Sequence, residues 1–289
     1  MDPSLMGTQV ILPDFTIPSR IDQNWAYSGI DSPESCMDIV RFRGYPHKFN
    51  YQYNSRGYRD REWPDDLQSA IWCVGDSFTV GLGSPVEHTW PGVLESTTGS
   101  RTINISMDGA SNAWIARKAL RIIDTVQPHS IVVHWSYLHR RELDIATARE
   151  QVWINFYNAV RDPSWPKTAN FDQLPDEIKT EIIEVHNWPI LLSDEMRTAH
   201  HLKTTSEEDI DHTIDCIKQL GNRVVHTFIP GFVDQDNKEK FYATLDQAGI
   251  AYIRDIKRLD LARDGHHYDI KTATDYANKI ILALEHHAS

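Results

Sequence analysis

From residue 70 onward, short apolar runs alternate with longer stretches in which apolar residues recur every three or four positions. The short runs, which we expect to be strands, cover residues 70–74, 102–106, 131–135, 224–229 and 251–253. Strands that alternate with helices form a parallel sheet, because each connection is right-handed and covers one face. The pattern predicts an α/β fold: a three-layer α/β/α sandwich with a five-stranded, flavodoxin-like parallel sheet.

The stretches between the strands carry helix signals. One helix is expected to begin after Thr89 and end at Gly99, because threonine caps helix starts and glycine follows helix ends. A second carries Ile115, Ala119 and Ile122 on one face. Later helices are expected at residues 207–220, 237–247 and around 273–284.

Two segments interrupt the alternation. Residues 1–68 are rich in turn-forming residues and show no sustained period, so we expect an irregular N-terminal extension with a hairpin around residues 49–58. The sandwich domain then covers residues 69–289. Within it, residues 138–205 contain helical stretches separated by prolines and no clear strand, which predicts an inserted helical cap.

Composition narrows the class of protein. Of 289 residues, 40% are apolar and 24% charged, as in soluble globular proteins. With 29 basic against 41 acidic residues, the net charge of -12 argues against nucleic acid as a partner. No apolar run is long enough to span a membrane, and residues 1–4 lack a signal-peptide pattern, so we expect a cytoplasmic protein that does not bind membranes. The nine tryptophans suit core packing or stacking against sugar rings.

Gly75-Asp76-Ser77 lies where the first strand ends and the chain turns toward a helix. A serine there is presented at the carboxyl edge of the sheet, and the N–H groups of the turn favour nearby negative charge. The position suits a nucleophile. The same three residues also suit an ordinary turn.

A serine needs a base, and the base needs a carboxylate to orient it. Asp264-Gly265-His266-His267 follows the fifth expected strand, so it is expected at the same edge as Ser77. Residues three apart in one turn can bring their side chains together, and Asp264 can then hold Nδ1–H of His267 while Nε2 faces the serine. A His-His pair in a loop can equally be a solvated surface feature.

Acyl transfer also needs donors for the oxyanion that develops in the transition state. The backbone N–H of Ser77 is one candidate. Gly109 follows the second strand and brings another N–H to the same edge. A glycine there also fits a turn with no role in binding.

Together these segments resemble the GDSL, or SGNH, hydrolase superfamily of esterases and lipases. The resemblance rests on Gly75-Asp76-Ser77, on residues 104–109 and on the D-x-x-H block at residues 264–267, with a similar lead-in at residues 54–59. It implies the SGNH fold, Ser77 as nucleophile, His267 as base and Asp264 as its orienter. Ser77 and Gly109 would supply the oxyanion N–H groups.

One block departs from the family. After the third strand the superfamily usually has G-x-N-D, whose asparagine donates to the oxyanion, whereas residues 134–142 contain no asparagine. Losing such a donor typically costs about 3 kcal/mol of transition-state stabilisation. Ser136 or Tyr137 would have to replace it, and Ser136 is the favoured candidate; otherwise the protein is slow or inactive.

Four histidines at the expected strand ends could converge on a zinc ion, but their spacing follows no zinc motif, so no metal or cofactor is expected. These are His134, His139, His266 and His267. The run Arg140-Arg141-Glu142 is expected to be a solvated or ion-paired helix start, or to touch an acidic substrate.

The sequence therefore favours a serine esterase that hydrolyses acyl or O-acetyl esters, with a small molecule or a carbohydrate ester as substrate. Two alternatives stay open. The same residues serve transfer of the acyl group to an acceptor other than water, and the altered third block suits a non-catalytic protein that binds a sugar or a protein partner.

Overall fold

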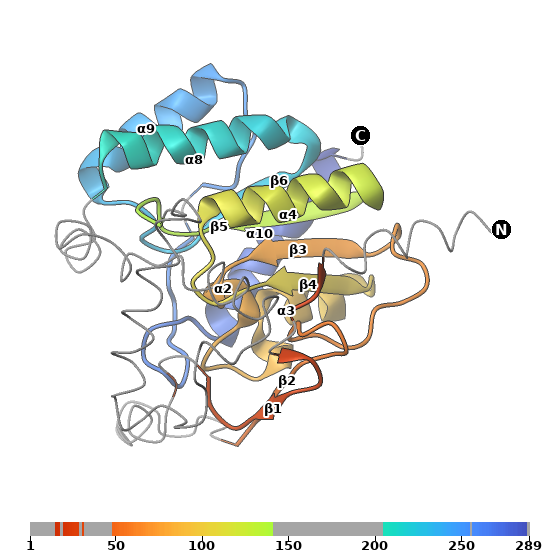
Figure 1. Ribbon diagram of the computed structural model, residues 1–289. Coiled ribbons are helices and arrows are strands. Elements are labelled where there is room, and N and C mark those ends of the chain that lie inside the picture. Colours follow the sequence, from red (N-terminus) through yellow and green to blue (C-terminus); the bar gives the residue numbers. More distant parts are fainter. Residues whose placement is uncertain are drawn as a thin grey trace, which may run out of the picture.

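The computed structural model describes residues 15–17, 20–28, 31, 48–140, 205–254 and 256–287. At its centre lies a sheet of four parallel strands in the order β4-β3-β5-β6 (Figure 1). Its strands are β3 (Ile71–Gly75), β4 (Thr102–Ser106), β5 (Ser130–Trp135) and β6 (Val225–Phe228). Since β3 lies between β4 and β5, the order is flavodoxin-like, and the predicted α/β class is confirmed.

The fifth strand is where the prediction was wrong in detail. Of residues 251–253, Tyr252 forms a single parallel bridge with His226 of β6. The N–H of Ile253 donates to the His226 carbonyl at 2.9 Å. The run is short and the charged Arg254 follows directly. The chain therefore occupies the expected fifth position without extending into a strand.

The strands bring their carboxyl ends to one edge of the sheet. Gly75 of β3 lies opposite Ser106 of β4, and Val74 lies opposite Val133 of β5. Nearly every strand residue is buried, as expected for a parallel sheet covered on both faces. The segments that follow β3, β4 and β5 therefore leave the sheet side by side.

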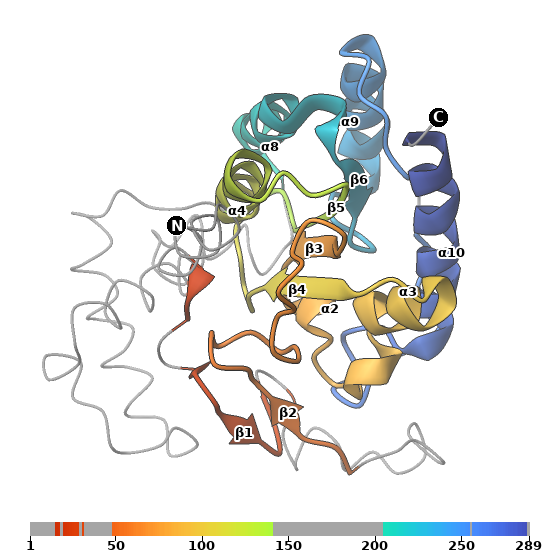
Figure 2. The same cartoon turned by 90° about the vertical axis from the view of Figure 1, so that its right-hand side faces the viewer.

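Helices cover both faces of the sheet. Figure 2 shows α3 (Trp90–Thr98) and α10 (Ile270–His287) on one side, where they contact each other. On the other side α4 (Asn112–Thr125) packs against α8 (Glu207–Leu220), and α9 (Gln235–Gln247) contacts α8. This gives the predicted three layers.

Local capping explains where the helices begin and end. The Thr89 side chain accepts from Gly92 N–H at the start of α3, and Gly99 ends the helix with φ 70°, as predicted. Helix α9 begins before residue 237 because the Asp234 side chain caps it by accepting from Asn237 N–H. Short 3-10 turns lie at η3 (Val86–His88) and η6 (Gly221–Arg223).

The N-terminal part of the chain pairs differently from the expected hairpin. Strand β2 (Tyr51–Gln52) pairs antiparallel with β1 (Asn24–Trp25) and not with the residues that follow it. After β2 the chain makes a tight turn, in which Asn54 N–H donates to the Tyr58 carbonyl at 2.9 Å. The turn is therefore where it was expected, but the strand partner lies earlier in the chain.

Part of the extension packs into the core of the sandwich. Phe15, Ile17 and Tyr58 are buried within the main apolar cluster, together with residues of β3 and β4. The predicted helical insertion lies outside the described residues except at its two ends, since residues 141–204 are not described. Among the helices that the structure describes, none is long and apolar enough to cross a membrane.

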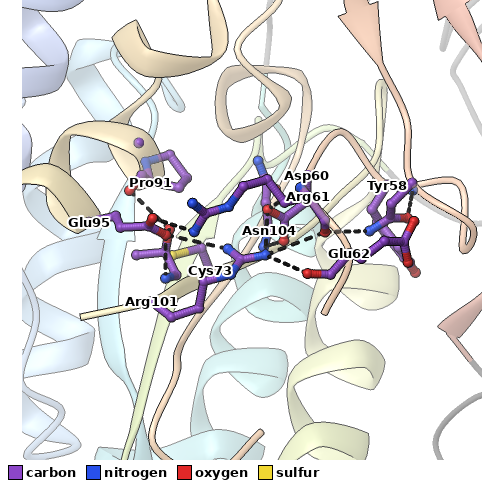
Figure 3. Close-up of polar contacts among 12 residues, drawn as sticks. Tyr58, Asp60, Arg61, Glu62, Cys73, Pro91, Glu95, Arg101 and Asn104 are labelled. Atoms are coloured by element: carbon purple, nitrogen blue, oxygen red, sulfur yellow. Dashed lines mark hydrogen bonds and ion pairs between the residues drawn. The ribbon is translucent and has the colours of Figure 1, made fainter. Parts of the chain in front are cut away.

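A charged network joins the extension to β4 and α3 (Figure 3). Arg101 Nη2 donates to Asp60 Oδ1 at 2.9 Å, and Asn104 N–H donates to Asp60 Oδ2 at 3.1 Å. Glu95 of α3 accepts from Thr102 N–H at 2.9 Å and pairs with Arg101 at 3.4 Å. Burial raises the pKa of Asp60 to about 6, although Arg101 and the N–H donors act in the opposite direction.

The first prediction concerns this carboxyl group. In a carboxyl-detected NMR titration, Asp60 should titrate with a midpoint near 6, because burial disfavours its charged form. Its pKa is then higher in the folded than in the unfolded chain. Between pH 4 and 6 the folded chain holds the proton longer, so Asp60 should lower the free energy of unfolding as pH rises through this window. The exposed Asp66, held by Ser69, should instead titrate below its usual range.

An Asp60 midpoint near that of an ordinary aspartate would contradict the buried network. The Asp60→Asn variant controls for assignment, and it should remove this part of the pH dependence of unfolding measured with urea.

Candidate active site

Ser77 begins α2 (Ser77–Val80), directly after β3. The turn between them needs Gly75, since a Cβ at that position would collide with the Thr79 side chain. The Asp76 side chain caps the helix, with Oδ1 accepting from Phe78 N–H at 3.0 Å. This local geometry holds the Ser77 side chain at the carboxyl edge of the sheet.

Helix α2 is also held at its far end. The helix ends at Gly81, whose φ of 75° lies in the left-handed region. The guanidinium of Arg59, which is buried, donates to the carbonyls of Val80 at 3.0 Å and Ser84 at 2.7 Å. Arg59 belongs to the lead-in segment at residues 54–59, so that segment fixes the end of the serine helix.

Three of the predicted site residues meet at this edge. Ser77 Oγ lies 2.8 Å from His267 Nε2, and His267 Nδ1 lies 2.5 Å from Asp264 Oδ2. With its Nδ1–H donated to the carboxylate, the imidazole leaves Nε2 to accept from the Ser77 hydroxyl. All three residues are nearly buried, with 5%, 4% and 9% of their surface exposed.

The loop that carries the imidazole is ordered around Asp264. Gly265 has a φ of 69°, and the N–H groups of His266 and His267 donate to Asp264 Oδ1 at 2.9 and 3.0 Å. Burial raises the pKa of Asp264, but the hydrogen bond to His267, the charge of that ring when it is protonated and the two N–H donors outweigh burial and lower the pKa below the ordinary value. The carboxylate therefore stays ionised and holds the ring.

Contacts on the outer side of this loop fix it to the serine segment. Arg263 N–H donates to the Gly83 carbonyl at 2.9 Å, and the Ser84 hydroxyl donates to the Tyr268 carbonyl at 3.3 Å. The Phe78 ring lies 4.5 Å from the His267 ring. The neighbouring ring of His266 is partly exposed, whereas the His267 ring bonds the Ser77 hydroxyl, so His267 is the histidine that faces the serine.

Gly109 follows β4, whose last residue, Ser106, pairs with Gly75 at the end of β3, and Gly109 has a φ of 73°. Within the described part of the chain, neither Ser77 N–H nor Gly109 N–H donates a hydrogen bond to another residue. Two uncommitted N–H groups at neighbouring strand ends are the kind of donor that an oxyanion needs.

Ser136 lies after β5 but is fully committed to other groups. Its N–H donates to Asn112 Oδ1 at 2.8 Å, and its hydroxyl donates to Asp76 Oδ2 at 2.6 Å. Ser136 Oγ also accepts a hydrogen bond from Arg140 Nη1 at 2.7 Å. A hydroxyl has one proton to donate. The expected role of Ser136 as a third oxyanion donor therefore does not agree with its contacts.

Arg140 forms an ion pair, which is one of the two placements expected for it, but the pair is buried, which the sequence did not indicate. Its side chain is 4% exposed and pairs with the fully buried Asp76 at 2.7 Å. A charged run is usually a solvated surface, which hid this pair. The signal that could have found it is the aspartate of the serine motif, since a carboxylate buried beside a strand end needs a cation.

The other histidines considered for a metal lie elsewhere. His134 is fully buried, and burial lowers its pKa to about 3, so it stays neutral with Nδ1 at 2.5 Å from the Tyr276 hydroxyl. His139 stacks on the Tyr137 ring. Across the described residues, no three His, Cys, Asp or Glu side chains gather as a metal site.

Four of the tryptophans in the described residues pack in the core. Trp72, Trp90, Trp114 and Trp135 are each exposed by 1% or less. These four cannot stack on a sugar ring. An open pocket of about 480 Å³ is lined by other aromatic side chains, Tyr27 and Phe49, beside Arg263. Ser77, His267 and Asp264 do not line it.

The chain matches no protein-family model and no curated protein sequence. Solved structures similar to it include a carbohydrate acetylesterase family member from Sinorhizobium meliloti, at 12% identity and TM-score 0.40, covering 75% of this chain and 98% of that one. A putative acylhydrolase from Bacteroides fragilis shows 11% identity and TM-score 0.36, with 79% and 92% coverage. A GDSL-like lipase from Bacteroides thetaiotaomicron shows 9% identity and TM-score 0.34, with 78% and 91% coverage.

In strand order and in the positions of its serine, glycine and D-x-x-H segments, the chain resembles the GDSL, or SGNH, hydrolases. The segment after β5 differs from the family, since it has no asparagine. In this segment Ser136 and Arg140 bind Asp76.

The second prediction tests the glycine that ends the serine helix. Gly81→Ala should lower the free energy of unfolding by about 3 kcal/mol, because an alanine strains the left-handed backbone and its Cβ collides with Thr89. Gly99→Ala is the matched control, since Gly99 has a similar φ of 70° but open space around its Cβ. It should cost about 1 kcal/mol in a urea titration. Equal losses in the two variants would contradict the close packing at Gly81.

Proposed function

We propose that this chain is a serine ester hydrolase of the GDSL, or SGNH, type, in which Ser77 is the nucleophile, His267 the general base and Asp264 the residue that orients it. The observation that carries the proposal is the continuous hydrogen-bonded chain from Ser77 Oγ through the His267 ring to Asp264, with separations of 2.8 and 2.5 Å. Such separations suit proton transfer without rearrangement.

In the first half of the reaction, Ser77 Oγ attacks the carbonyl carbon of the ester, and its proton passes to His267 Nε2. The negative charge on the carbonyl oxygen is stabilised by the N–H groups of Ser77 and Gly109, which have no partner among the described residues. The bond to the alcohol then breaks, His267 returns the proton to the leaving alcohol oxygen, and the acyl group stays on Ser77.

In the second half, water attacks the acyl carbon and gives a proton to the same imidazole. The bond between the acyl carbon and Ser77 Oγ then breaks, the imidazole returns the proton to Ser77 Oγ, and the carboxylic acid leaves. Asp264 stays ionised throughout, because the hydrogen bonds that it accepts keep its pKa below the usual range despite burial. Its charge stabilises the imidazolium that forms in each half.

A small acyl group suits this site best. Ser77 and His267 expose only 5% and 4% of their surface, and the Phe78 ring packs against the imidazole. These features favour acetyl or another short acyl group. We propose a small-molecule or carbohydrate ester as the substrate class, with hydrolysis of O-acetyl groups as the reaction to screen first.

The third prediction tests the nucleophile and the base. Purified protein should hydrolyse p-nitrophenyl acetate, and Ser77→Ala and His267→Ala should each lower kcat/KM by at least about 10³-fold, because either loss breaks the proton path. His266→Ala is the matched control, since this neighbouring ring does not face Ser77, and it should lose far less activity.

A protein that folds but turns over neither p-nitrophenyl acetate nor a panel of acetylated sugars would favour the non-catalytic alternative. Turnover that survives Ser77→Ala would place the chemistry at another residue.

A further inference from the structure

A buried carboxylate lies directly beside the proposed nucleophile. Asp76 is fully buried and accepts three hydrogen bonds: from Phe78 N–H at 3.0 Å, from the Ser136 hydroxyl at 2.6 Å and from Arg140 Nη1 at 2.7 Å. Its first oxygen orders the start of α2, and its second holds the segment after β5. Asp76 thus ties the Ser77 turn to the neighbouring strand end.

This carboxylate creates an electrostatic difficulty for the proposed reaction. In the transition state, negative charge develops on an oxygen bound at the N–H of Ser77, one residue from Asp76. An unpaired carboxylate so near the oxyanion in a buried site repels this charge and should lower the rate on the order of 10- to 100-fold. It also favours the protonated form of a nearby imidazole, which cannot act as a base.

Arg140 neutralises the negative charge of Asp76, because its guanidinium forms an ion pair with this carboxylate. The guanidinium donates to Asp76 Oδ2 and to Ser136 Oγ, both at 2.7 Å, and its side chain is only 4% exposed. The pair is therefore little screened by solvent.

Other groups near Asp76 do not replace this cation. The hydroxyls of Tyr137 and Tyr268 lie in the electric field of Asp76. Burial and the charge of Asp76 raise the pKa of both hydroxyls, so both are neutral. The Tyr137 ring lies 5.0 Å from the Arg140 guanidinium and packs against it. Arg258 adds positive charge near Tyr137.

We propose that Arg140 is a positioning residue for the ester reaction. Its guanidinium neutralises Asp76, so that the carboxylate can hold the Ser77 turn while the oxyanion forms beside an electrically balanced pair. The inference rests on the function proposed above and assigns the part of the site where the chain departs from the SGNH pattern.

The fourth prediction follows from the charge. Arg140→Gln should lower kcat for p-nitrophenyl acetate by about 10- to 100-fold with little change in KM, because the unpaired carboxylate acts on the transition state. The midpoint of the acid limb of the pH–kcat profile should move to higher pH. Arg140→Lys keeps the charge and should recover part of the rate.

The decisive variant removes both charges. In Asp76→Asn/Arg140→Gln, asparagine retains the helix cap, because its side-chain oxygen can still accept from Phe78 N–H. This double variant should be faster than Arg140→Gln alone, and its acid limb should return toward that of the wild type. If it is as slow as Arg140→Gln, or if Arg140→Gln leaves the acid limb unmoved, the proposal is wrong and the guanidinium acts through packing alone.

Arg101→Gln controls for the general cost of breaking an Arg–Asp pair. This variant removes the partner of Asp60, and Asp60 bonds neither Ser77 nor Asp76. It should change the free energy of unfolding without moving the acid limb of the pH–kcat profile. If Arg140→Gln does not fold, the double variant decides alone: its kcat should stay within about 10-fold of the wild type, and a larger loss, or an acid limb moved to higher pH, would overturn the proposal.

Failure of this inference is distinct from failure of the esterase function. Wild-type turnover that is lost in Ser77→Ala establishes the reaction, and the Arg140 series then tests only the role of the pair. Absence of wild-type turnover overturns the function itself.

Discussion

The parallel pairing of β3 with β4 on one side and β5 on the other is the constraint on which the site depends. It sets the end of β3 opposite Ser106 and beside the end of β5, so that three chain segments leave the sheet at one edge. Ser77, Gly109 and Ser136 follow those three strands. The loop before α10 then closes on this edge through the contact between His267 and Ser77, which are 190 residues apart.

Two buried carboxylates flank the serine, and each has a different partner. Asp264 holds a histidine ring and is kept ionised by hydrogen bonds that outweigh the effect of burial. Asp76 holds the serine turn and is paired with a permanently charged arginine. Asp264 orients a ring that must gain and lose a proton. The charge of Asp76, in contrast, must be neutralised throughout the reaction. The choice of histidine for one and arginine for the other fits these separate tasks.

The sequence predicts best what local chemistry decides. Thr89 and Gly99 bound α3 because capping involves only nearby residues, and apolar periodicity was enough to separate strands from helices. Topology then brought Ser77 and His267 to one edge, since strand order places them there whatever lies between. The fifth strand failed because periodicity indicates an extended run but not how many residues find a partner.

Pairings between distant segments could not be predicted. Nothing near Arg140 in the sequence indicates a buried position, and its contact with Asp76 spans 64 residues. The pairing of β2 with β1 was missed for the same reason, since the expected hairpin used only neighbouring residues. Ser136 was chosen as a donor for its residue type and position, whereas its single proton is held by Asp76.

The most direct measurement is covalent labelling with a serine-directed fluorophosphonate, followed by peptide mapping with mass spectrometry. The account predicts one adduct, on the peptide that contains Ser77, with the label absent in Ser77→Ala and strongly slowed in His267→Ala. An adduct on a different residue in a protein that hydrolyses esters, or labelling that does not depend on His267, would contradict it.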